Sequence, residues 1–182
     1  KDVLLETAAR LDAAGLEIRL QAGEFLWWFF PGTGPFDSKG MAFYDAFTAA
    51  AAVFALGRPL ESFNTAVDDP TVNGGADVAF LQQQLHDYIA AIAAHVKGTY
   101  PAALIEILLP YDVNYPVRAG VNDLGGQLIH AVNMPSGWKV PATAPFDLIK
   151  MEALDWQVGA RNQNLAIETM RWPFTGGGTW PK

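Results

Sequence analysis

The chain repeats a strand-like segment at a nearly constant spacing, and this regularity constrains its fold more than any other feature. Strands are predicted near residues 16–22, 59–64, 103–109 and 147–154, so they begin about 44 residues apart. Segments with helical periodicity lie between them, the longest over residues 77–96. Strands that alternate with helices, through crossovers long enough to return the chain, pair in parallel.

The same spacing indicates how much of a larger fold is present. At about 44 residues per unit, eight units need about 350 residues, as in a (β/α)8 barrel with insertions. The 182 residues therefore predict an α/β chain of four consecutive parallel β/α units, half or a fragment of a (β/α)8 TIM-type barrel. Residues 1–182 would then form a single β/α domain or a fragment of a larger barrel.

A doubly wound open sheet is the competing architecture. No predicted strand is followed by a G-x-G-x-x-G or G-x-x-x-x-G-K-[ST] loop, the usual phosphate cradle of such sheets. Arg19, Glu106 and Lys150 lie in the middle of predicted strands. Because a polar strand face is more typical of a large barrel interior than of a sheet covered by helices, we favour the barrel.

Composition narrows the class of partner. A net charge of -7 without any run of lysine or arginine argues against nucleic acid or an anionic membrane surface, and a neutral ligand such as a carbohydrate fits better. The chain has no cysteine, and no His, Asp and Glu set has metal-ligand spacing, so we expect neither a metal nor a cofactor. No apolar stretch is long enough to span a membrane, and the N-terminus lacks the layout of a secretion signal.

One carboxylate, Glu24, stands at the end of the first predicted strand, directly before the aromatic run F-L-W-W-F-F. Aromatic faces stack on sugars, and a carboxylate transfers protons, although a packed aromatic core with a satisfied acid is the alternative. Active sites of parallel barrels lie at the carboxyl ends of the strands. The substrate-binding candidates at those ends are Trp27, Trp28, Asn64, Tyr111, Asp112, Asn114 and Trp156.

On these residues the chain resembles the catalytic half of the retaining glycoside hydrolases that use a (β/α)8 barrel. Those enzymes place one glutamate after strand four and another after strand seven, and the segments G-E-F-L-W-W and M-E-A-L-D-W stand three predicted strands apart. The resemblance implies that Glu24 is the general acid/base and Glu152 the nucleophile, about 5 Å apart. The alternative for Glu152 is an ion pair with Lys150 or Arg19 inside the barrel.

The second hypothesis is a non-catalytic barrel that binds sugar or serves as a scaffold, as enzyme-like barrels do within large phage-tail and cell-surface proteins. A half barrel leaves two open sheet edges and an exposed apolar face, so we also expect the remaining barrel units or a second copy, a homodimer, as partner. Asp68 and Asp69 stand before Pro70 and are interpreted as turn residues, with a catalytic pair as the alternative.

Overall fold

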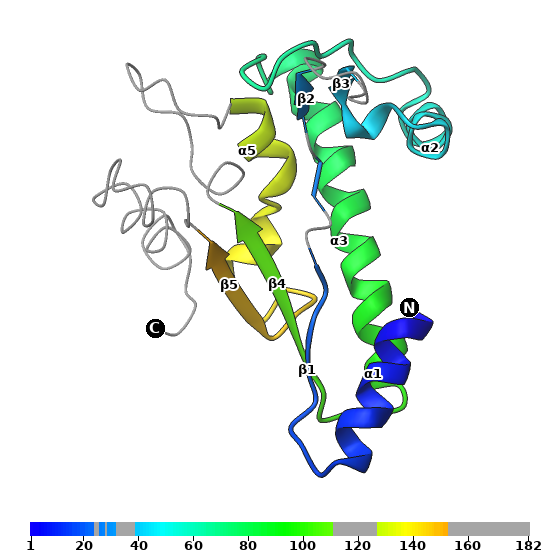
Figure 1. Cartoon of the computed structure of the whole chain (residues 1–182). Coiled ribbons are helices and arrows are strands. Elements are labelled where there is room, and N and C mark those ends of the chain that lie inside the picture. Colours follow the sequence, from blue (N-terminus) through cyan, green and yellow to red (C-terminus); the bar gives the residue numbers. More distant parts are fainter. Residues whose placement is uncertain (24–25, 28, 32–38, 111–126, 153–182) are drawn as a thin grey trace, which may run out of the picture. The chain divides into compact units, whose positions relative to one another are not determined.

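The computed structural model describes residues 1–23, 26–27, 29–31, 39–110 and 127–152 (Figure 1). The chain divides into two compact units. Unit 1 comprises Lys1–Phe25, His86–Pro110 and Ser136–Lys182, and unit 2 comprises Leu26–Leu85 and Tyr111–Pro135. In the parts that the structure describes, no helix is both long and apolar enough to cross a membrane.

Unit 1 is built on a parallel sheet of three strands. The strands are β1 (Arg19–Gln21), β4 (Leu104–Pro110) and β5 (Leu148–Glu152), in the order β1-β4-β5. Gln21 pairs with Glu106, and Pro110 pairs with Glu152. An α/β fold with parallel strands is therefore confirmed.

The two faces of this sheet differ in polarity. One face is apolar, and its residues Leu20, Ile105, Ile107 and Leu109 are buried. The buried residues Ile89, Ile92 and Val96 belong to the part of α3 (Ala76–Lys97) that lies in unit 1, and α1 (Asp2–Ala13) contacts β1. On the other face Lys150 Nζ donates a hydrogen bond to Gln21 Oε1 at 3.3 Å, and both side chains are exposed. Leu108, which pairs with Lys150, is buried on this second face, so the sheet has one apolar face and one mixed face.

Asp147 fixes the start of β5. Its Oδ2 accepts a hydrogen bond from the Ile105 N–H at 2.8 Å, and Lys97 Nζ donates to its Oδ1 at 2.7 Å. Beside it, Trp138 of the 3-10 helix η3 (Ser136–Lys139) packs edge-on against Phe146, with ring centroids 5.3 Å apart. The carboxylate and the ring pair connect the last strand to the helix layer of unit 1.

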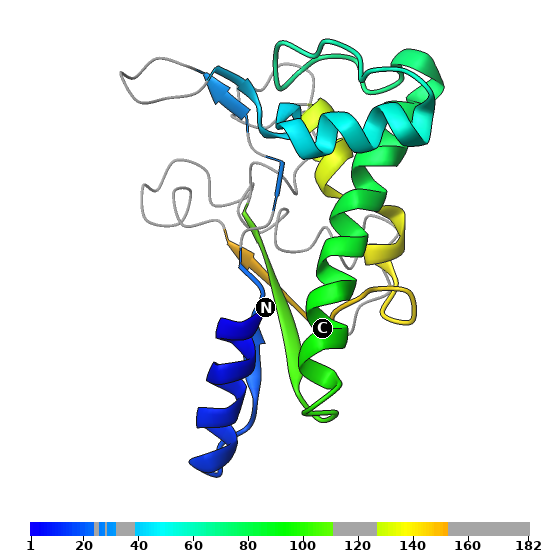
Figure 2. The ribbon, with the colours of Figure 1, turned by 90° about the vertical axis from the view of Figure 1, so that its right-hand side faces the viewer.

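Unit 2 has a separate core and mixed secondary structure. Its elements are the hairpin of β2 (Phe29–Pro31) and β3 (Lys39–Met41), the 3-10 helices η1 (Ala42–Tyr44) and η2 (Val72–Gly75), α2 (Ala46–Leu56), the start of α3, and α5 (Gln127–Asn133). In Figure 2, α2 (cyan) runs across the direction of α3 (green). The buried side chains of this core include Phe43, Phe63, Phe80, Leu81 and Leu128.

The four consecutive β/α units that the spacing predicted are not confirmed. Residues 59–64 contain no strand, and β1 pairs directly with β4. The N–H groups of Glu61 and Phe63 donate to the Asp77 carboxylate and the Tyr44 hydroxyl, so side chains take the place of a neighbouring strand. The single domain over residues 1–182 stays a prediction.

Chain order explains why a strand was expected at this point. The first segment of unit 2 follows the carboxyl end of β1 and the second follows the carboxyl end of β4. Unit 2 is thus made from two insertions in unit 1, one between β1 and the second half of α3 and one between β4 and η3. The first insertion is long enough to resemble one further β/α unit in the sequence.

Candidate functional site

The carboxyl ends of the parallel strands are the place where a barrel carries its site. Glu152 is the last residue of β5, and the structure describes its backbone, which pairs with Pro110 of β4. Trp27 and Asn64 also belong to the described part of the chain. The other candidates, Glu24, Trp28, Tyr111, Asp112, Asn114 and Trp156, lie outside the described residues. The pairing of Glu24 with Glu152 therefore stays a prediction.

Trp27 is held by partners that are distant in the sequence. Its N–H donates to Asn133 Oδ1 at 2.6 Å, and its indole Nε1 donates to the Leu81 carbonyl at 3.1 Å. Asn133 is fully buried, and its Nδ2 donates to the carbonyls of Trp27 and Ile129, both at 3.0 Å. The Trp27 ring packs edge-on against Phe43 at 6.0 Å. Through these contacts Trp27 connects the first insertion with α5.

Asn64 lies in an exposed turn that Asp68 organises. The N–H of Asn64 donates to Asp68 Oδ2 at 2.5 Å, and both the N–H and the hydroxyl of Thr65 donate to the same carboxylate. The hydroxyl bond from Thr65 is the largest cause that lowers the pKa of Asp68 below its ordinary value. Asp69 accepts two equivalent bonds from Thr71, which lower its pKa. This geometry supports the turn interpretation of the two aspartates.

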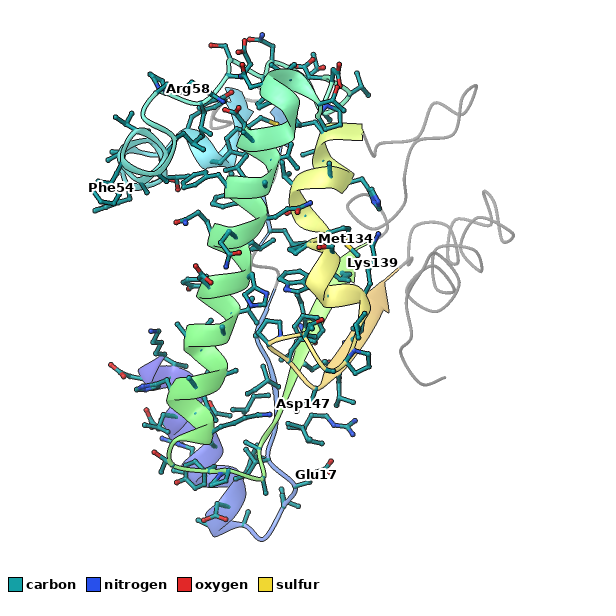
Figure 3. All side chains as sticks on the ribbon, turned by 180° about the vertical axis from the view of Figure 1, so that it is seen from behind. Glu17, Phe54, Arg58, Met134, Lys139 and Asp147 are labelled. Atoms are coloured by element: carbon teal, nitrogen blue, oxygen red, sulfur yellow. The ribbon has the colours of Figure 1, made fainter. Side chains whose placement is uncertain are left out.

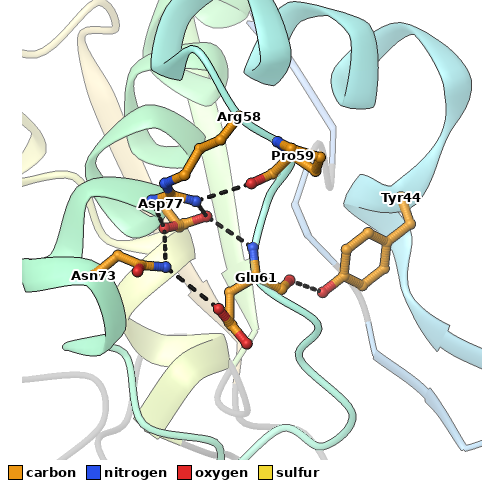
Figure 4. A network of polar contacts seen from close by, with 6 residues as sticks. All are labelled: Tyr44, Arg58, Pro59, Glu61, Asn73 and Asp77. Carbon is orange, nitrogen blue, oxygen red and sulfur yellow. Dashed lines mark hydrogen bonds and ion pairs between the residues drawn. The ribbon is translucent and has the colours of Figure 1, made fainter.

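A buried ion pair, which sequence patterns did not indicate, lies at the start of α3 (Figure 4). Asp77 is fully buried, and its two carboxylate oxygens accept from Arg58 Nη1 at 3.1 Å and Nη2 at 2.6 Å. The Glu61 N–H adds a bond of 2.9 Å and Asn73 Nδ2 one of 3.2 Å. The hydrogen bond from Arg58 is the main cause that lowers the pKa of Asp77, against the opposing effect of burial.

The residues around this pair hold the loop before α3 in place. Asn73 adopts a left-handed backbone with φ of 54°, and its side chain reaches both Asp77 and Glu61. The Tyr44 hydroxyl accepts from the Phe63 N–H at 2.6 Å and donates to the Glu61 carbonyl at 2.5 Å. Burial is the largest cause that raises the pKa of Tyr44. Because donors surround the carboxylate and its charge is balanced, the network fits a structural role.

Among the residues that the structure describes, there is no candidate site for a metal ion. There, no three His, Asp or Glu side chains are grouped so that they could share one ion. Among the described side chains of the sheet, Lys150 Nζ donates a hydrogen bond to Gln21 Oε1.

The architecture defines the class of protein first. Parallel strands joined through helical crossovers, as in the sheet of unit 1, are the units from which α/β barrels are built. The sequence matches the family described as "Non-contractile tail sheath protein TIM barrel" over residues 1–171. The chain belongs to this family of TIM barrel domains. No curated protein and no solved structure matches the chain.

The family match decides between the two hypotheses at a coarse level. It supports a TIM-barrel module of a phage-tail protein, which was the alternative to a glycoside hydrolase. It gives no support to glycosidic bond cleavage or to a carbohydrate partner. The catalytic roles of Glu24 and Glu152 are therefore supported neither by the family match nor by a described side-chain geometry.

Proposed function

We propose that this chain is a structural domain of a phage tail, where it packs against other copies or subunits and does not turn over a substrate. The observation that carries the proposal is the family match over residues 1–171. A sheath is built from repeated contacts between subunits, so its domains need stable folds and complementary surfaces. Barrels host many functions, and the fold alone does not require catalysis.

Two features of the described residues support a structural role. The indole N–H of Trp27 is bonded to a backbone carbonyl, and its ring is packed against Phe43. Asp68 and Asp77 have lowered pKa values because neighbouring groups donate hydrogen bonds to them. These carboxylates are thus occupied by contacts within the fold.

Two measurements test the proposal. Cross-linking mass spectrometry on assembled tails should recover links between this domain and other copies or tail subunits. The full chain should also leave a panel of polysaccharides uncleaved, and Glu24→Gln and Glu152→Gln should give the same background. Turnover by the wild type that is lost in either variant would replace the proposal with the retaining glycoside hydrolase.

A further inference from the structure

The loop before α3 contains the one Asn-Gly dipeptide of the sequence, Asn73-Gly74. Asparagine is chemically labile, and it loses its side-chain amide most readily before glycine. The reason is steric, because glycine has no Cβ to hinder attack by its own backbone nitrogen. Both residues are exposed to solvent. The dipeptide therefore has the local chemistry of a deamidation site.

Deamidation begins when the Gly74 backbone nitrogen attacks Asn73 Cγ. The nitrogen gives up its proton, the Cγ–Nδ2 bond breaks, and Nδ2 takes up a proton and leaves as ammonia. Water then opens the resulting succinimide ring at either of its carbonyl carbons, which yields aspartate or isoaspartate. Both products carry a carboxylate in place of the amide, and isoaspartate also adds a methylene to the backbone.

The folded loop holds the two reacting atoms apart. Ring closure needs the Gly74 nitrogen on the same side of the Cα–C bond as the Asn73 Cβ, whereas the observed ψ of 32° turns this nitrogen to the opposite side. The amide itself is also held, since Asn73 Nδ2 donates to Asp77 Oδ2 at 3.2 Å and to Glu61 Oε2 at 3.4 Å (Figure 4). The reaction therefore requires the loop to open first.

Opening of this loop does not require the whole unit to unfold. Asp77 stays in place when Asn73 leaves, because Arg58 donates two hydrogen bonds to the Asp77 carboxylate. Arg58 lies beside the first turns of α3 in Figure 3. Asn73 is also the only non-glycine residue with a positive φ in the described part of the chain, at 54°. Local opening at a strained, exposed loop costs less free energy than global unfolding.

The product does not fit the place that the amide occupies. A carboxylate at residue 73 would face the carboxylates of Asp77 and Glu61 at the distances that now join donor and acceptor. Like charges so close together repel, and the positive charge of Arg58 is already paired with Asp77. The contacts that close the loop over asparagine thus oppose its closure over the acid.

We propose that Asn73-Gly74 is a deamidation site that the Asp77 network protects, and that the reaction detaches the loop at residues 71–75 from the start of α3. The change runs in one direction, because ammonia is lost to solvent. Each molecule undergoes it once, at a rate set by how often the loop opens. This proposal is independent of the role in a phage tail.

Peptide mapping by mass spectrometry tests the site after incubation of the full chain at neutral pH. Asn73 should convert to the acid, whereas Asn64, which is equally exposed but precedes threonine, should keep its amide. Urea should accelerate conversion at Asn73 by about tenfold or more, and Asp77→Ala in buffer by about threefold or more, because both raise the open fraction of the loop. An intact amide at Asn73 in the folded chain, or equal rates in buffer and urea, would overturn the proposal.

Thermal unfolding tests the consequence of the reaction. Asn73→Asp reproduces the aspartate product, and Asn73→Gly is the matched control, because glycine accepts the φ of 54° and removes the same donor without adding a charge. Tm of Asn73→Asp should lie at least about 4 °C below that of Asn73→Gly, since only the first variant introduces the repulsion. Equal Tm values in the two variants would overturn the proposed detachment of the loop.

Discussion

The Asp77→Ala substitution tests the buried ion pair most directly. Asp77 accepts four hydrogen bonds in the structure, two of them from Arg58. The substitution removes the acceptor from all four donors and leaves the guanidinium without its counter-charge. The loop that precedes α3 then loses its main attachment to that helix. We expect a large loss of stability with little change in secondary structure.

The magnitude follows from the burial of the two partners. Breaking a buried ion pair by removing one partner costs about 3–5 kcal/mol. The Arg58 side chain is 35% exposed and regains water when Asp77 is removed. The expected cost is therefore at the lower end, about 3 kcal/mol. For a chain of this length each kcal/mol lowers Tm by about 2–4 °C, so Tm should fall by about 6–12 °C.

Thermal unfolding followed by circular dichroism measures this loss. Asp12→Asn is the matched control, because Asp12 is an exposed carboxylate on α1, and it should stay within about 1 °C of the wild type. Arg58→Lys keeps the charge but cannot reproduce the two-pronged contact, so its Tm should lie between the wild type and Asp77→Ala. A change of less than about 2 °C in Asp77→Ala would refute the argument that the network stabilises the fold.

The pH dependence gives an independent check on the same carboxylate. The folded pKa of Asp77 is lowered from 3.8, so the folded chain holds its charge where the unfolded chain already binds a proton. The stabilisation is therefore complete above about pH 4 and is lost as pH falls through the folded pKa. The difference in Tm between the wild type and Asp77→Asn should shrink as pH falls below about 4. A difference that is constant from pH 7 to pH 2.5 would contradict this assignment.

Two further substitutions probe unit 2. Asn133→Leu should lower the free energy of unfolding by about 2–3 kcal/mol and change the near-ultraviolet circular dichroism, because the N–H and carbonyl of Trp27 lose their buried partner. Urea unfolding measures this loss of stability, and an unchanged midpoint would exclude a stabilising role. Gly57→Ala should lower the free energy of unfolding by about 1 kcal/mol, because a φ of 69° strains any residue with a Cβ, although an added Cβ would meet no neighbour. Urea unfolding also measures this change, and a gain in stability would show that the position is not strained.

The fold was predictable where local patterns decide it. The long helix α3 (Ala76–Lys97) and the strands β4 and β5 lie close to their predicted positions, because continuous apolar periodicity and apolar runs specify them. The end of α2 at Gly57 follows from a local rule as well, since glycine adopts the left-handed conformation without strain. The sequence signals that specify such elements lie within a few neighbouring residues.

The remainder depends on partners that are distant in the chain. Residues 59–64 alternate like a strand, but their N–H groups bind Tyr44 and Asp77 instead of a neighbouring strand. Trp27 was predicted to bind substrate, but its side chain and backbone are held within the fold, and its main partner, Asn133, is 106 residues away. The strands β2 and β3 have three residues each, too few to give a periodic signal. No local pattern encodes these pairings.

The position of the insertions connects the fold to the proposed function. Parallel barrels carry their working loops at the carboxyl ends of the strands, and the chain of unit 2 follows β1 and β4 at that end. In an enzyme these loops keep polar groups available for a substrate. In the described residues of these insertions, polar groups bind one another, with Asp77 bonded to Arg58 and Asn133 bonded to Trp27. The same insertions leave the apolar side of α2 exposed. An exposed apolar surface beside internally bonded polar groups supports the proposed role of these insertions in contacts with another protein.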